Sequence, residues 1–71
     1  MGMVLDAPPT IPGEKLKAHR EGHGVEQQAI AKVLGHHRNT IAAWEKDPEV
    51  DLRRQRLYLG AVRKIVDEHL A

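Results

Sequence analysis

The sequence contains five histidines, the side chains best suited to metal binding or to proton transfer near neutral pH. His19 and His23 are four residues apart, so a helix would place them on one face, and His36 and His37 are adjacent. A structural zinc site needs four ligands, usually cysteines and histidines, and the chain has no cysteine. We therefore predict no metal site and no other cofactor.

The acidic side chains form no recognisable catalytic grouping. The sequence has no glycine-rich phosphate-binding loop and no nucleophile within a known catalytic motif. Glu26 and Glu45 are explained more simply as a residue at the start of a helix and as a structural acid. The chain is predicted not to be an enzyme.

Positive charge is concentrated in two segments, although the net charge is only +1. Residues 27–44 contain Lys32, Arg38 and two histidines but no acid. Residues 52–64 also lack acids, and their basic residues are Arg53, Arg54, Arg56, Arg63 and Lys64. Such segregation creates local positive potential, which is typical of a nucleic-acid-binding surface. Two solvated helix faces explain the same pattern equally well.

The apolar residues recur with the period of helices, and no useful stretch alternates as a strand would. A first helix begins near Pro12 and is ended by Gly22 and Gly24. A second helix spans about 26–34 and is followed by Gly35, a residue type favoured where a helix ends.

A third helix is predicted from about 37 or 38 to 46, with Ile41 and Trp44 facing inward. From Asp51 almost to the end the pattern is again helical, and Gly60 leaves open whether this is one helix or two. We predict a compact all-α domain of four or five helices over residues 11–71, preceded by a flexible N-terminal arm over 1–10.

The second and third helices are joined by the short turn Leu34-Gly35-His36-His37, which makes them a helix-turn-helix by geometry. Helix pairs with a glycine turn also occur in proteins that do not bind DNA. The geometry alone therefore leaves the function open.

Residues 14–48 resemble the lambdoid repressor/Cro-type helix-turn-helix family, which also includes xenobiotic-response-element-type regulators and many antitoxins. The resemblance is carried by Arg20, Gln27, the Ile30-Ala31 pair, Gly35 and the Ile41-x-x-Trp44-Glu45 ending. It implies a lambda-repressor-like fold and a sequence-specific DNA-binding transcriptional regulator, in first place a repressor of the phage Cro-like or immunity type.

The resemblance also implies roles for individual residues. Gln27 matches a residue that grips a DNA phosphate, and Arg20 and Glu45 match an internal ion pair. In the third helix, Arg38 has the donors to chelate guanine, and Asn39 has the groups to pair with adenine. The full set expected to contact DNA is Gln27, Gln28, His37, Arg38, Asn39, Thr40, Ala43, Lys46 and Arg53.

The sequence departs from the family pattern in three places. His19 and His36 occupy positions that are usually apolar, so the core is expected to be wetter there or to pack imidazoles. Asp47-Pro48 replaces the usual glycine turn and adds negative charge near the expected DNA surface. The tail after residue 50 does not clearly match the family's last helices.

An apolar stripe in the tail comprises Leu52, Leu59, Val62, Val66 and Leu70, with Tyr58, Ile65 and His69 flanking it. Its first half is predicted to complete the core. A possible dimer surface is predicted at Val62, Ile65, Val66 and Leu70, which would place two recognition helices about 34 Å apart on a pseudo-palindrome. The alternative is an antitoxin or another protein-interaction module that uses this stripe.

The chain of 71 residues has no run of 18 apolar residues, so no membrane span is predicted. The lack of cysteine fits a reducing cytoplasm, either around a bacterial nucleoid or in a phage-infected cell. The expected partner is double-stranded DNA, and no small-molecule effector is expected because no residues remain to build an effector domain.

Overall fold

The computed structural model describes residues 10–70, which form four helices. They are α1 (Gly13–Gly22), α2 (Gln27–Leu34), α3 (Arg38–Lys46) and α4 (Leu52–Leu70). Within residues 10–70 the only β-type pairing is an isolated bridge between Ile11 and Val50. The predicted all-α class is confirmed, whereas the predicted arm over 1–10 lies outside the described residues except for Thr10.

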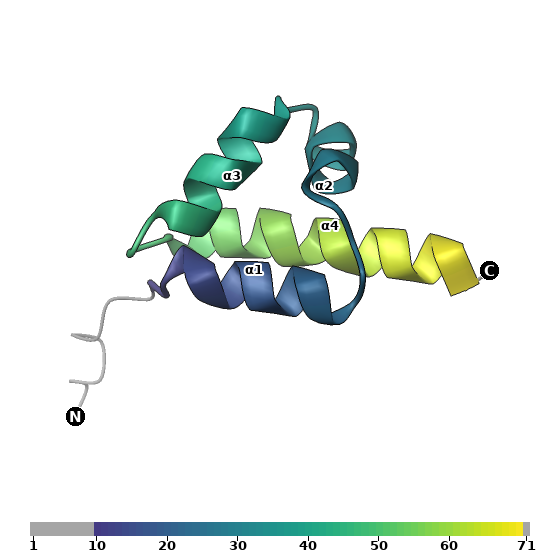
Figure 1. Ribbon diagram of the computed structural model, residues 1–71, viewed down its shortest axis with the longest axis horizontal. Coiled ribbons are helices and arrows are strands. Elements are labelled where there is room, and N and C mark those ends of the chain that lie inside the picture. Colours follow the sequence, from purple (N-terminus) through teal and green to yellow (C-terminus); the bar gives the residue numbers. More distant parts are fainter. Residues whose placement is uncertain (1–9, 71) are drawn as a thin grey trace.

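The helices form two levels (Figure 1). α1 and α4 lie side by side along the base, and α2 and α3 stand above them. α3 packs on both α1 and α2, and α4 packs on both α1 and α2. This arrangement leaves the outer side of α3 uncovered by any other described helix.

α4 continues through Gly60 without a break, so the open choice between one helix and two is resolved as one. Its C-terminal turns extend past the end of α1 (Figure 1). Leu70 near the end of α4 is therefore 78% exposed.

The core is small and draws on every helix. Its fully buried large side chains are Tyr58, Leu16, Ile30, Ile41, Val50 and Val62. The predicted inward positions Ile30, Ala31 and Ile41 are all buried.

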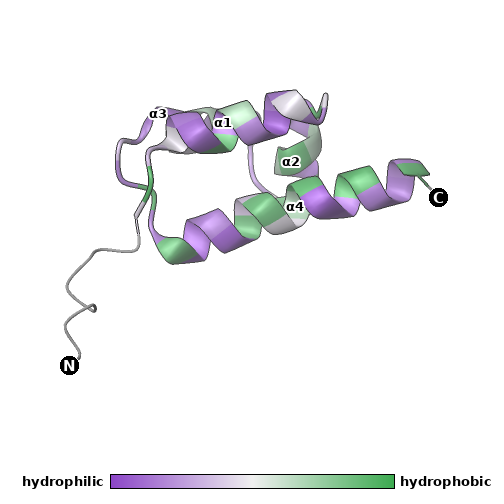
Figure 2. Ribbon diagram, turned by 90° about the horizontal axis from the view of Figure 1, so that it is seen from below, coloured by the Kyte–Doolittle hydropathy of each residue, from purple (hydrophilic) through white to green (hydrophobic). Residues whose placement is uncertain are grey.

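The predicted core stripe of α4 is partly wrong. Leu52 and Leu59 are 39% and 37% exposed, whereas Tyr58, predicted as a flanking residue, is completely buried. The face of α4 that meets the core is centred on Tyr58, Ala61 and Val62. Figure 2 shows that apolar and polar segments alternate along α4.

Two glycines have strict structural roles. Gly35 ends α2 with φ of 71°, in the left-handed region that side chains rarely adopt. Gly13 begins α1 beneath the end of α3, and a Cβ on it would lie 1.9 Å from the carbonyl oxygen of Trp44. Gly13 N–H donates to the Asp47 carbonyl at 2.7 Å, which fixes this close approach.

Of the two alternatives at His19 and His36, the packing of imidazoles into the core is wrong, because both side chains are exposed. The His19 ring packs edge-on against His23, with ring centroids 4.8 Å apart. The His36 ring packs edge-on against Trp44 at 5.6 Å. Both rings therefore pack against aromatic neighbours at the protein surface, and neither imidazole is buried.

The turn between α3 and α4 is fastened by Arg54. Its Nη1 donates to Asp47 Oδ2 at 2.9 Å, its Nε to Asp51 Oδ1 at 3.1 Å and its Nη2 to the Glu49 carbonyl at 3.2 Å. Asp51 directly precedes α4 and accepts the Arg54 backbone N–H, as a helix-capping acid does.

Candidate nucleic-acid interface

The outward side of α3 carries most of the predicted contact residues. Because an α-helix has 3.6 residues per turn, Asn39, Ala43 and Lys46 share the side opposite the buried Ile41, whereas Arg38, three residues before Ile41, lies at the edge of that side in the first turn. All four are exposed, and Thr40 lies at the edge of this side and is half-buried. The helix thus presents donors, an amide and one small residue to solvent.

A hollow of about 360 Å³ brings three predicted residues together. Gln27 and Gln28 from the start of α2 and Arg38 from the start of α3 line it, beside Arg20 and Glu26. Backbone N–H groups at the start of a helix favour an anion, and Arg38 adds a full positive charge. Arg38 and the start of α2 thus favour an anion in the hollow, whereas the Glu26 carboxylate opposes one.

His37 caps α3 with its own ring. Its Nδ1 accepts the backbone N–H of Asn39 at 3.1 Å. An imidazole nitrogen that accepts a hydrogen bond carries no proton, so the neutral ring must carry its proton on Nε2. The cap therefore makes His37 Nε2 a hydrogen-bond donor.

Behind this surface, the carboxylate of Glu45 is the centre of a buried hydrogen-bond network. Arg20 Nε donates to Glu45 Oε2 at 2.7 Å and Arg20 Nη2 donates to Oε1 at 3.2 Å. Gln27 Nε2 donates to Oε1 at 2.8 Å, and the Tyr58 hydroxyl donates to Oε2. Arg20 Nη1 also donates to the Val25 carbonyl at 2.9 Å. The ion pair that the resemblance implies is present between α1 and α3, and the hydrogen bonds from Gln27 and Tyr58 extend the network to α2 and α4.

The network is buried, with side-chain exposures of 10% for Arg20 and 3% for Glu45. Burial alone would raise the pKa of Glu45, but hydrogen bonds from Arg20, Tyr58 and Gln27 outweigh it and hold that pKa below its ordinary value of 4.5. The hydrogen bond to Glu45 raises the pKa of Arg20. Burial and the nearby Glu45 carboxylate raise the pKa of Tyr58. Glu45 and Arg20 are thus both charged at neutral pH.

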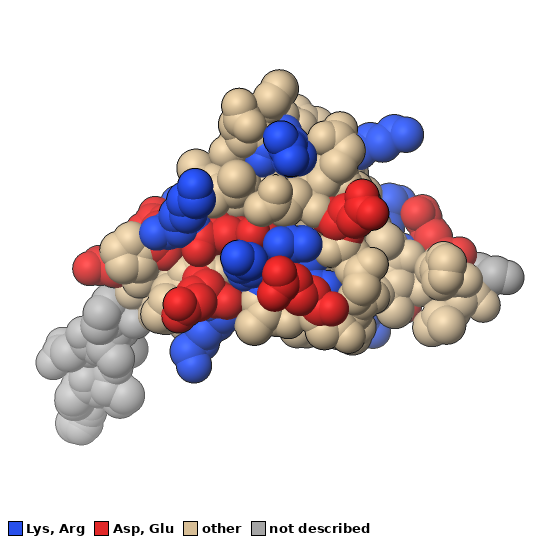
Figure 3. All heavy atoms as spheres, in the orientation of Figure 1, with Lys and Arg blue, Asp and Glu red and all other residues tan. Residues whose placement is uncertain are grey.

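Charge is distributed unevenly over the surface. In Figure 3 the uppermost part, over the turn between α2 and α3, carries basic and neutral atoms, whereas acidic atoms gather lower, over α1 and α4. Asp47, expected to place negative charge near the DNA surface, pairs with Arg54 at 2.9 Å. Hydrogen bonds from the Glu49 backbone and from Arg54 lower the pKa of Asp47. Its negative charge is thus offset by the arginine.

The comparison with protein families decides the identity of this domain. The family model described as helix-turn-helix matches residues 16–59, which include α2, the turn and α3. The chain belongs to the lambda repressor/Cro-type helix-turn-helix family. Comparisons with curated proteins and with solved structures gave no match.

Membership of the helix-turn-helix family supports a DNA-binding transcriptional regulator, and members of this family are regulators rather than enzymes. Within residues 10–70, no helix is both long enough and apolar enough to cross a membrane. The same described part contains no group of three or more histidines or acids placed to hold a metal ion.

The remaining predicted residues lie on α4 and differ in how exposed they are. Arg53 is exposed in the first turn of α4, on a different helix from the other contact residues. Of the predicted dimer surface, Val62 is wrong, because it is 1% exposed and belongs to the core. Ile65 and Val66 are half-buried, and Leu70 is exposed.

The sequence did not reveal the roles of Tyr58, Gly13 and Arg54. Tyr58 precedes the buried Ala61 and Val62 by three and four residues, which is a signal that it shares their face. Gly13 is the first residue of α1 and directly follows Pro12, and its close contact with α3 has no local signature in the sequence. Arg54 is one of several arginines and is distinguished only by its three-residue distance from Asp51.

Proposed function

We propose that this helix-turn-helix protein is a sequence-specific repressor, of the Cro-like or immunity type found in phages, that inserts α3 into the DNA major groove. The observation that carries the proposal is the exposed polar side of α3 beside the hollow lined by Gln27, Gln28 and Arg38. Repression follows from occupying a promoter, and no effector is required.

In this proposal, phosphate and base contacts come from different residues. Gln27, Gln28, Thr40, Lys46 and Arg53 contact phosphates and position the protein on the duplex, whereas His37, Arg38, Asn39 and Ala43 face the bases. Arg38 has the geometry to bind guanine O6 and N7, and Asn39 to bind adenine N6 and N7. Ala43 is small enough to admit a thymine methyl group.

The hydrogen bond by which His37 caps α3 limits the base atoms that this side chain can bind. Because its Nδ1 is engaged by Asn39, only its Nε2–H faces outward as a donor. We expect it to bind an acceptor on a base edge, such as guanine N7 or O6 or thymine O4, and not the amino group of cytosine or adenine.

Selection of binding sequences from a random duplex pool tests the function, followed by measurement of the Kd at several salt concentrations. A defined consensus, with an association constant that falls steeply as salt rises, is the expected result. A protein that selects no sequence from the pool contradicts the proposal. Weak binding with a steep salt dependence but no consensus would show a nonspecific DNA-binding protein instead.

A further inference from the structure

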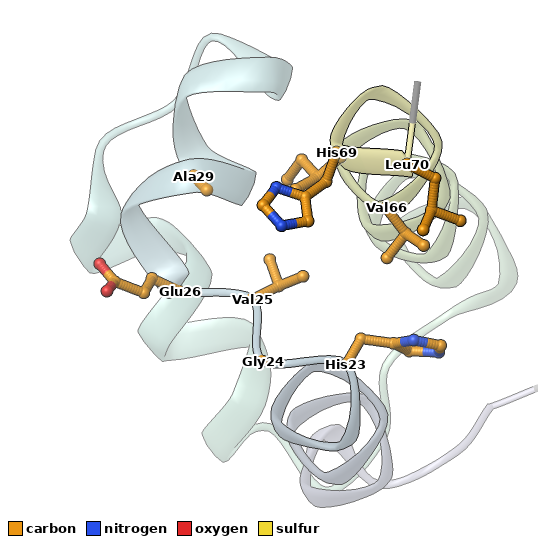
Figure 4. A pocket seen from close by; sticks show the side chains of 9 residues that line it. His23, Gly24, Val25, Glu26, Ala29, Val66, His69 and Leu70 are labelled. Atoms are coloured by element: carbon orange, nitrogen blue, oxygen red, sulfur yellow. The ribbon is translucent and has the colours of Figure 1, made fainter.

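Two histidines at the end of α1 lie next to each other on the surface. His19 is in the last turn of α1, and His23 directly follows the helix. Both side chains are exposed, and their rings pack edge-on with centroids 4.8 Å apart. Figure 4 shows the His23 ring pointing away from Val25 and lying apart from the His69 ring on α4. The ring of His23 is therefore paired with the last turn of α1.

We propose that His19 and His23 together bind one divalent transition-metal ion, such as Zn²⁺ or Ni²⁺. A histidine nitrogen bound to Zn²⁺ lies about 2.0–2.1 Å from the ion, so the centroid of its ring lies about 3.2 Å away. Two rings at adjacent coordination positions, about 90–110° apart, then have centroids about 4.5–5.2 Å apart. The 4.8 Å between the two rings falls within this range. The backbone of α1 therefore already holds both imidazoles at the spacing that one shared ion requires.

The electrostatic surroundings of the pair favour a cation. The C-terminal end of a helix carries partial negative charge, and both histidines lie at that end of α1. Arg20, between them in the sequence, is buried and ion-paired within the core network. The two histidines line a hollow of about 340 Å³ together with Arg63 and Asp67 of α4. The charges of Arg63 and Asp67 offset each other, because the two side chains pair at 3.9 Å.

Two protein ligands make this an open surface site, different from the four-ligand structural zinc site that the lack of cysteine excludes. Within residues 10–70, no third histidine or acid is placed with this pair to hold a metal ion, so water fills the remaining coordination positions. Imidazole is a ligand of Zn²⁺, Ni²⁺ and Cu²⁺, whereas Mg²⁺ and Ca²⁺ prefer oxygen ligands. The site therefore selects transition-metal ions over Mg²⁺ and Ca²⁺.

Metal binding at this site stabilises the folded chain. The helical backbone holds the two rings together, whereas in the unfolded chain nothing keeps them at one ion, so the ion binds the folded state more tightly. The stabilisation acts on the last turn of α1, from which Gly24 and Val25 lead toward α2. Metal binding requires no DNA, so this inference does not rest on the proposed function.

Titration of the full chain with NiCl₂ in the absence of DNA, followed by ¹H–¹⁵N NMR and by calorimetry, tests the proposal. We expect one Ni²⁺ per chain. Paramagnetic Ni²⁺ should first broaden the amide signals of residues 18–24, and MgCl₂ should shift no signal of this segment. The urea concentration at the midpoint of unfolding should rise with Ni²⁺ or Zn²⁺. A wild-type chain that binds no Ni²⁺, or whose first broadened signals lie elsewhere, overturns the proposal.

Single substitutions identify the ligands. His19→Gln and His23→Gln should each weaken Ni²⁺ binding about tenfold or more, because the remaining imidazole no longer acts together with a second one. Each should also abolish the rise in the urea midpoint. The matched control is His69→Gln, which removes an exposed histidine of α4 and should leave both effects intact. Circular dichroism checks that all three variants are folded. Binding that persists unchanged in His19→Gln or His23→Gln, or that is lost in His69→Gln, overturns the assignment.

Discussion

Gln27 Nε2 lies 2.8 Å from Glu45 Oε1, so a residue that lines the hollow proposed to bind a DNA phosphate is hydrogen-bonded directly to the buried ion pair. Gln27 is half-buried, whereas Glu45 is almost completely buried. The hydrogen bond fixes the side chain that opens α2. The position of the proposed phosphate site therefore depends on the core network behind it.

Replacing Gln27 should affect stability and DNA binding together. Gln27→Ala removes a hydrogen bond to a charged group, and we expect a loss of about 1.5–3 kcal/mol in the free energy of unfolding. DNA binding should weaken by a similar factor for every sequence, because the contact is to phosphate. Gln28→Ala is the matched control, since Gln28 lines the same hollow and donates no hydrogen bond to Glu45. This variant should bind DNA more weakly while its free energy of unfolding stays nearly unchanged. Equal stability of the two variants would contradict the structural role of Gln27.

Acid should destabilise the protein through Glu45. The pKa of Glu45 is lowered on folding, so its contribution is fully present above its ordinary pKa of 4.5 and is lost as pH falls through the lower folded-state value. Asp47 and Asp51 act in the same direction, because hydrogen bonds also lower their pKa values. Urea unfolding at a series of pH values below 5 measures the effect. Glu45→Gln should be less stable at neutral pH and should show a shallower acid dependence, and an unchanged slope would rule out Glu45 as a source.

Two glycines should respond in opposite directions to the same change. Gly13→Ala places a methyl group against the Trp44 carbonyl, which belongs to the backbone and cannot easily shift. We therefore expect the free energy of unfolding to fall by an amount at or above the roughly 1–3 kcal/mol typical of overpacking. Gly60→Ala meets no atom within 4 Å and lies inside α4. It should stabilise the protein by about 0.5–1 kcal/mol. Thermal unfolding of both variants gives the comparison, and a neutral Gly13→Ala would mean that α1 and α3 are not in close contact.

Base and phosphate contacts should be separable with Arg38 and Lys46. Arg38→Ala should relax the preference at one base pair at a cost of about 1–3 kcal/mol. Lys46→Ala should weaken all sequences alike and reduce the salt slope by about 1. Sequence selection repeated with each variant distinguishes the two. An unchanged consensus for Arg38→Ala would show that another residue reads that base pair.

The sequence predicted the features that depend on local patterns. The ends of α2 and α3, and the burial of Ile30, Ala31 and Ile41, follow from helical periodicity and from Gly35. The predicted stripe of α4 was wrong at Leu52 and Leu59 because two neighbouring stripes on that helix are both apolar. The choice between them depends on Tyr58, whose hydroxyl needs Glu45, a residue on another helix.

Of the surface proposed to bind DNA, the sequence predicted some features but not the hydrogen bonds that position its side chains. The exposed side of α3 follows from its periodicity, and the ion pair between Arg20 and Glu45 was implied by family resemblance. The hydrogen bond from Gln27 to Glu45 and the cap formed by His37 were not predictable. Both depend on side-chain positions set by packing between helices or by local backbone geometry, and no spacing in the sequence encodes them.

The carboxylate of Glu45 also has a consequence for how this protein unfolds. Because α1, α2 and α4 each donate a hydrogen bond to that one group on α3, the departure of any helix leaves a buried charge without its full set of donors. We therefore expect the four helices to unfold as one cooperative unit, and α2 and α3 not to stay folded without α4. Amide protons across all four helices should exchange with solvent through a common global opening, and not through the separate melting of individual segments.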